Sequence, residues 1–211
     1  MKEKYNDYIN INHKFDKITM LGIFCLLIVV AGCFGFIYEY IFYFLNGGMK
    51  EFYWRGGNFL PWINIYATGS IMIYILTYRY RKKPFKVFLI GLISSGILEY
   101  ISGAGMYLIA NKRCWDYNKE ILNFGNIHGF VCLRSVLFFE LSGLLLIYVI
   151  IPLLFSLAKK MDKKLFLFIS ITLCSIILID EFYNLLIARI FRLPRAYDVY
   201  KKLGFKFVNF K

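Results

Sequence analysis

Residues that bind metals or form disulfides are scarce in this chain of 211 residues. Its two histidines are far apart in the sequence, and its five cysteines include no CxxC pair. Because a zinc site needs such ligands at short and regular spacing, no metal site is predicted. Four cysteines lie in apolar runs, where a free thiol behaves as a small hydrophobic group. They are Cys25, Cys33, Cys132 and Cys174.

Motifs of common catalytic sites are missing as well. The chain has no GxSxG turn around a nucleophilic serine, no HExxH metalloprotease helix and no GxxxxGK[ST] phosphate-binding loop. The sequence therefore predicts no catalytic residue and no cofactor, and it favours a protein that is not an enzyme.

Charge is also limited, at 18% of residues, although the net charge is +13. The basic residues form short blocks between apolar segments, mainly at 79–86 and 159–164. No helix or sheet pattern would present them as one basic face to a groove, so a nucleic-acid partner is excluded. Blocks of this kind hold loops on the cytoplasmic side of a membrane and contact anionic headgroups.

What the chain has in abundance is long apolar runs, with 59% hydrophobic residues overall. A membrane helix needs about 20 apolar residues. Five runs meet that length, and the sequence predicts an all-α polytopic transmembrane bundle of five helices. The predicted segments are 18–45, 59–78, 87–110, 129–158 and 165–191. They form one transmembrane domain, 18–191, between an N-terminal cytoplasmic tail, 1–17, and a basic aromatic C-terminal tail, 192–211.

Orientation follows from the lysine and arginine counts of the loops. The N-terminal tail and the loops at 79–86 and 159–164 share one side and carry most of the basic residues. We therefore expect a multi-pass protein of the cell (inner or plasma) membrane with a cytoplasmic N-terminus. The basic C-terminal tail opposes this arrangement, because five crossings would place it outside.

Several charged residues interrupt the apolar runs or lie beside them. Counting helical rise from the basic ends places them in the same half of the membrane, on the side of the loops at 46–58 and 110–127. Small residues such as Gly35 and Ser95 lie one turn from the glutamates and favour helix contacts there. Together with Trp115, which would act as an interfacial anchor, these residues form the predicted polar cluster: Glu39, Arg55, Glu99, Trp115, Asp116 and Arg134. Asp180 is a further candidate for this cluster.

Three interpretations of the predicted polar cluster remain open. Buried glutamate–arginine pairs can be purely structural and fix which helix meets which. Charged groups at membrane depth can instead mark a path for a substrate or for protons. Glu39 or Arg134 can also extend to the membrane interface while its stem stays in the apolar layer.

A set of short motifs occurs in a fixed order between about 34 and 148. They are Gly35-Phe36-Ile37-Tyr38-Glu39, Arg55-Gly56, Pro61-Trp62 with Ile65-Tyr66, Leu98-Glu99-Tyr100 with Ser102-Gly103, Arg113 with Trp115-Asp116-Tyr117, and Asn126-Ile127-His128-Gly129 before Cys132-Leu133. In this order the chain resembles the ABC-transporter type IV family, or CmpB-type permease domain. It departs from the family pattern at Asn64 and Ala67, where members tend to have proline and glycine, and at Phe130, where members usually have arginine.

The resemblance implies a permease or a small transport component. Such a protein would need a separate ATPase subunit, because this chain has no phosphate-binding loop of its own. Five helices are few for a translocation path, so a homo-oligomer or a larger complex is expected in the lipid bilayer. The alternatives are a non-transporting scaffold or regulatory subunit and an intramembrane enzyme that acts on a lipid or on another membrane protein.

Overall fold

The computed structural model describes residues 15–46, 53–111 and 113–207, in which nearly all regular structure is helical. Within these ranges, four helices are long and apolar enough to cross a membrane. They cover Lys17–Leu45, Pro84–Ile109, Leu133–Lys160 and Lys163–Ile190. The predicted class, an all-α transmembrane helical bundle, is confirmed.

Part of the predicted orientation depends on residues outside the described ranges. These are the basic residues Lys2, Lys4, Lys14, Lys50 and Lys112. Most of the predicted N-terminal tail and positions 208–211 of the C-terminal tail are also outside them. The side of the membrane on which the N-terminus lies stays a prediction.

The second predicted span, 59–78, corresponds to a shorter helix, α3 (Asn64–Thr77), followed by the turn η1 (Tyr78–Tyr80). The loop before α3 is fixed on α2 (Lys17–Asn46). The indole N–H of Trp62 donates to the carbonyl of Ile28 over 3.0 Å, and the N–H of Ile63 donates to the carbonyl of Gly32 over 3.1 Å. These contacts hold Trp62 and Ile63 against α2, and α3 begins directly after them, at Asn64.

Two compact units make up the chain, and the boundary between them falls inside α3. The α2–α7 unit contains residues 16–68 and the described residues from 161 onward. The α4–α5 unit contains residues 69–160 and Phe15.

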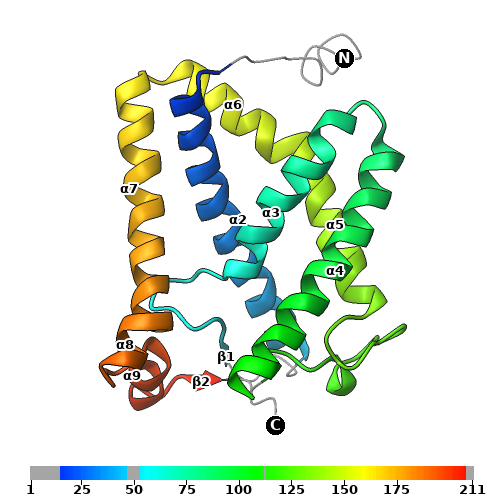
Figure 1. Cartoon of the computed structure of the whole chain (residues 1–211), viewed down its shortest axis with the longest axis vertical. Coiled ribbons are helices and arrows are strands. Elements are labelled where there is room, and N and C mark those ends of the chain that lie inside the picture. Colours follow the sequence, from blue (N-terminus) through cyan, green and yellow to red (C-terminus); the bar gives the residue numbers. More distant parts are fainter. Residues whose placement is uncertain (1–14, 47–52, 112, 208–211) are drawn as a thin grey trace. The chain divides into compact units, whose positions relative to one another are not determined.

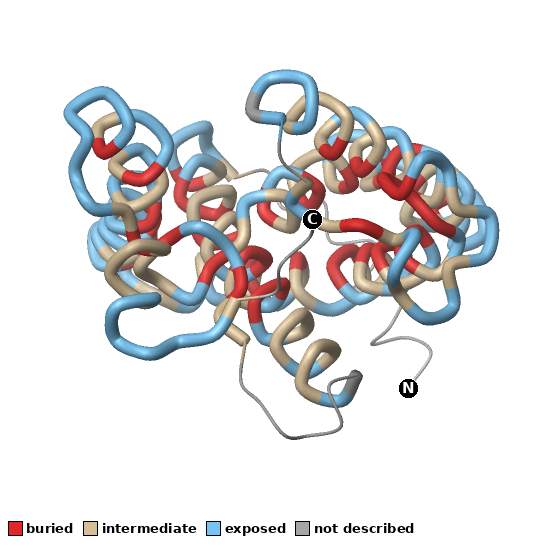
Figure 2. Tube along the Cα trace, turned by 90° about the horizontal axis from the view of Figure 1, so that it is seen from below, coloured by how far each residue is buried: buried red, intermediate tan, exposed pale blue. Residues whose placement is uncertain are grey.

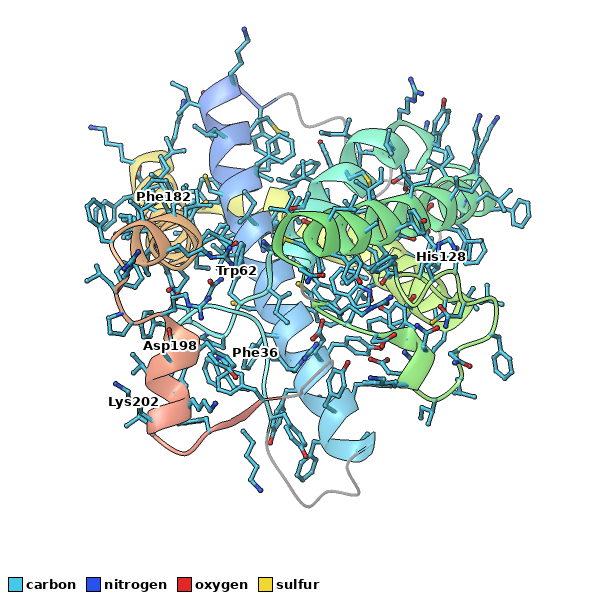
Figure 3. All side chains as sticks on the ribbon, turned by 60° about the horizontal axis from the view of Figure 1, so that its bottom comes forward. Phe36, Trp62, His128, Phe182, Asp198 and Lys202 are labelled. Atoms are coloured by element: carbon cyan, nitrogen blue, oxygen red, sulfur yellow. The ribbon has the colours of Figure 1, made fainter. Side chains whose placement is uncertain are left out.

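The α2–α7 unit is built on a helix pair, in which α2 and α7 (Lys163–Phe182) lie side by side (Figure 1). Gly22 allows this approach, because a Cβ there would press on the ring of Phe166. After α7 the chain continues through the π-helical turn η4 (Tyr183–Ile187), α8 (Ala188–Ile190) and α9 (Ala196–Lys202). The short strand β1 (Tyr53–Trp54) then pairs in parallel with β2 (Lys206–Phe207). Phe36 and Trp62, labelled in Figure 3, are both buried in this unit.

The α4–α5 unit has its own helix pair, α4 (Pro84–Ala110) and α5 (Leu133–Leu145). Helix α5 runs on through the π-helical turn η3 (Leu146–Ile150) into α6 (Ile151–Lys160). Pro152 has no N–H to donate, and this accounts for an irregular turn just before it. Between α4 and α5 lies the loop 111–132, which contains the turn η2 (Tyr117–Lys119).

Apolar side chains cover the outer faces of the long helices. On α4, Ile93, Ile97 and Ile101 follow one another at one-turn spacing, and each is more than half exposed. Figure 2 shows the same alternation of buried and exposed positions along the helices. An apolar stripe of this kind suits hydrocarbon rather than water, and it agrees with a membrane-spanning role for the helix.

Candidate functional site

Glu39 and Arg55 of the predicted polar cluster meet in the α2–α7 unit. Nε and Nη2 of Arg55 both lie 2.6 Å from Oε2 of Glu39. The hydroxyl of Tyr66 donates to the other carboxylate oxygen over 3.3 Å, and the Arg55 guanidinium lies 4.2 Å from the centre of the Tyr43 ring. Burial lowers the pKa of Arg55, but the charge of Glu39, its hydrogen bond and the nearby Tyr43 and Tyr66 together outweigh burial, so the pKa is raised and the arginine stays charged.

Acidic residues near the end of α7 fix the loop before α3. Both oxygens of Asp180 accept backbone N–H groups, from Phe59 over 3.1 Å and from Leu60 over 2.7 Å. Glu181 accepts the side-chain amides of Asn58 over 2.5 Å and Asn64 over 2.8 Å. Asp180, the further candidate for the cluster, therefore anchors a loop of its own unit.

In the α4–α5 unit, Glu99 lies on α4 and is only 5% exposed. Its Oε1 accepts the hydroxyl of Tyr117 over 3.0 Å, and its Oε2 accepts the hydroxyl of Ser135 over 2.7 Å. Tyr117 comes from the loop 111–132 and Ser135 from α5. The carboxylate thus joins both helices of the pair to the loop that connects them.

Trp115 and Asp116 lie inside the fold of the loop 111–132. The indole N–H of Trp115 donates to the carbonyl of Phe130 over 2.9 Å. Asp116 is 4% exposed, and its Oδ1 accepts both the backbone N–H and the side-chain amide of Asn118, over 3.2 Å and 2.8 Å. The same oxygen lies 3.5 Å from Nη1 of Arg113.

The glycine of the Asn126–Gly129 motif belongs to the same structure. Gly129 has a φ of +78°, and a Cβ there would collide with Asn118, Arg113 and Asp116. Its N–H donates to the side chain of Asn126 over 2.8 Å. The Trp115-Asp116-Tyr117 motif and the Asn126–Gly129 motif are therefore two parts of one loop core. His128, labelled in Figure 3, lies at its exposed side, 3.0 Å from the hydroxyl of Tyr100.

Arg134 lies in the first turn of α5 and forms an ion pair with Glu120, with Nη2 2.5 Å from Oε2. Its guanidinium also lies 5.6 Å from the centre of the Tyr117 ring. Tyr117 therefore touches Glu99 through its hydroxyl and Arg134 through its ring. The structure brings Glu99, Arg134, Trp115 and Asp116 into or around one loop, and it places the Glu39–Arg55 pair in the other unit.

Sequence reasoning missed three members of this network. Tyr117 was within reach, since it belongs to the Trp115-Asp116-Tyr117 motif and precedes a glutamate by three positions. Glu120 and Ser135 carry no signal in the sequence, because polar residues are common in a loop and in the first turn of a helix. In the described ranges, no group of three histidine, cysteine or acidic side chains is arranged to hold a metal ion.

These features define the class of protein: an all-α membrane protein with buried ion pairs and a structured loop between two of its long helices. The sequence model of the family described as "Putative ABC-transporter type IV" matches residues 26–185. The chain belongs to this family, as its motifs predicted, and the match is wider than the expected 34–148. No curated protein and no solved structure matches the chain.

Proposed function

We propose that this protein is a small permease or another membrane-spanning component of a transport system, and that a separate ATPase subunit supplies the energy. Membership of the family supports a transport role. Four long apolar helices supply the membrane part, and the sequence holds no phosphate-binding loop. The basic loops at 79–86 and 159–164 favour the cell membrane, with these loops and the N-terminus in the cytoplasm.

The observation that carries the proposal is the environment of Glu99. A carboxylate buried at membrane depth is costly and commonly marks the path of a substrate or an ion. Two hydroxyl groups, of Tyr117 and Ser135, meet it. A hydroxyl can donate or accept a hydrogen bond, so a polar substrate could take the place of either hydroxyl at this carboxyl group.

A second candidate, a non-transporting scaffold or regulatory subunit, is favoured by another observation. Trp115 and Asp116 make their contacts within the loop 111–132, and Glu39 is bound to Arg55. Trp115, Asp116 and the Glu39–Arg55 pair would then serve to fix the shape of their loops, and a partner protein could bind the surface of these loops. For the scaffold, we expect a stable complex that does not respond to any solute.

Purification of the tagged protein from its native membranes separates the candidates. For a permease we expect an ATPase subunit in a fixed ratio to the chain, detected by mass spectrometry and by ATP hydrolysis. Recovery of the chain alone, or only as a homo-oligomer, would contradict the permease. Recovery with a partner that lacks ATPase activity would favour the scaffold.

Glu99→Gln then tests the site. The amide keeps the size of the side chain but cannot carry the charge. We therefore expect normal abundance in the membrane and a large loss of ATP hydrolysis by the purified complex. Exposed Asp162 offers a control of the same type, Asp162→Asn, with both quantities close to wild type. If Glu99→Gln instead lowers abundance and leaves activity per molecule intact, the role of Glu99 is structural.

A further inference from the structure

A second glutamate of the α4–α5 unit is buried more deeply than Glu99. Glu140 lies on α5, one and a half turns beyond Ser135, and its exposed fraction is 0%. Neither of its carboxylate oxygens has a hydrogen-bond partner in the described part of the chain. Buried polar groups nearly always find partners, so this arrangement asks for an explanation.

Three residues that border the Glu140 carboxyl group present backbone or hydrocarbon to it. A Cβ on Gly91 of α4 would overlap the carboxylate, and a Cβ on Gly143 of α5 would lie 3.2 Å from Oε2. Ile73 of α3 borders the same space, with Cδ1 2.8 Å from that Gly143 position. The absent side chains of two glycines therefore make the room that the carboxyl group occupies.

Charged and titratable groups on the three helices around Glu140 have other partners. On α4, Lys86 lies over the ring of Tyr80 at 4.0 Å, and Glu99 is bound to Tyr117 and Ser135. Tyr74 of α3 stacks on Tyr78 at 4.8 Å, and Arg134 of α5 pairs with Glu120. After α5, the hydroxyl of Tyr148 donates to the carbonyl of Arg81.

An ionised carboxylate in such a site is strongly disfavoured. Transfer of an isolated charge into an apolar interior costs so much that the group takes up a proton instead. The neutral acid avoids the cost of a buried charge and occupies the space beside Gly91. We propose that Glu140 is a proton-binding site within the membrane-spanning part of the α4–α5 unit, occupied by a proton in this conformation.

The site does not depend on an ATPase partner or on the role of Glu99. Proton exchange at Glu140 requires water, or a donor, to reach the space between α4 and α5. If proton exchange at Glu140 is part of the function, the contact between Glu140 and Gly91 must open during that function. If it is not, the carboxyl group stays neutral throughout.

The test uses the purified full-length protein and the hydrophobic reagent dicyclohexylcarbodiimide, which modifies protonated carboxyl groups. At about pH 8, far above the ordinary glutamate pKa of about 4.3, we expect modification at Glu140, located by mass spectrometry, and its loss in Glu140→Gln. Asp198 is an internal control that stays unmodified, because hydrogen bonds from Arg195 hold its pKa below the ordinary value. Modification of Glu140 at about pH 5 but not at about pH 8 would overturn the proposal, since the group would be reachable but ionised.

If the reagent reaches Glu140 at neither pH, infrared difference spectra of wild type against Glu140→Gln decide the question. Loss of a neutral carboxylic acid C=O band in the variant supports the proposal. Loss of the bands of an ionised carboxylate overturns it. The variant should accumulate normally, because glutamine is neutral and has nearly the shape of the protonated acid, whereas Glu140→Lys should not accumulate.

Discussion

The acidic residues of the two units differ in what surrounds them. In the α2–α7 unit, Glu39, Asp180 and Glu181 each receive donors from the segment 55–66. In the α4–α5 unit, the loop 111–132 reaches Glu99 through Tyr117, but Glu140 receives no donor in the described part of the chain. Depth along the helix explains the contrast: Glu140 lies five positions beyond Ser135, about 7.5 Å further along α5. Acids within reach of a loop receive hydrogen-bond donors from it, whereas Glu140 lies beyond that reach, and we propose that it holds a proton instead.

The largest expected change in stability comes from removing the hydrogen-bond partner of an acid in the α2–α7 unit, so that this acid lacks a charged donor as Glu140 does in the described part of the chain. Arg55→Ala leaves the Glu39 carboxylate, which is 17% exposed, without its arginine; removing one member of a buried pair costs up to about 3–5 kcal/mol. We expect a matching loss in the free energy of unfolding, measured by denaturant titration of the purified protein. The exposed Arg79→Ala should change it by less than about 0.5 kcal/mol.

Adding Glu39→Gln to Arg55→Ala removes the stranded charge and should restore part of the lost stability. A double variant as unstable as Arg55→Ala alone, or a single variant within about 1 kcal/mol of wild type, would show that the pair is not an energetically important link of the α2–α7 unit.

A smaller effect is expected where the α4–α5 unit makes room for its unpartnered acid. Gly91→Ala would push a methyl group into the Glu140 carboxyl, and overpacking of this kind costs about 1–3 kcal/mol. We expect a lower midpoint of thermal unfolding. Gly105→Ala is a matched control on the same helix, because a Cβ there meets nothing within 4 Å. Equal midpoints for the two variants would contradict the packing described around Glu140.

The smallest expected effect concerns Glu99, which receives hydroxyl donors, whereas Glu39 pairs with an arginine and Glu140 has no donor in the described part of the chain. Tyr117→Phe removes one of the donors to Glu99 but keeps the ring beside Arg134. A hydrogen bond to a buried group contributes about 1 kcal/mol, so the free energy of unfolding should fall by about that amount. Tyr107→Phe, at an exposed position of the same unit, should leave it unchanged, and a similar loss in both variants would argue against the bond to Glu99.

The fold class was predictable from the sequence because runs of about 20 apolar residues have few other uses. The start of α3 was not, since Trp62 reads as an apolar residue and only its contacts with Ile28 and Gly32 show that it belongs to a loop. Helix spacing placed Glu39 and Arg134 near other charges but could not assign their partners. Those partners, Arg55 and Glu120, come from loops, whose paths depend on local turns such as the one at Gly129.

The pairing of β1 with β2 has a consequence for how the protein is made. Tyr53 lies opposite Lys206 in this pairing, and α2 packs on α7, which is synthesised after the whole segment from Gly69 to Lys160. The residues of the α4–α5 unit between Gly69 and Lys160 are continuous in the chain, so this unit can be complete while α2 still waits in the bilayer for its partner. Truncated chains that end before α7 will therefore have a complete α4–α5 unit and an incomplete α2–α7 unit. We expect membrane quality control to degrade them, because the apolar face of α2 lacks its partner.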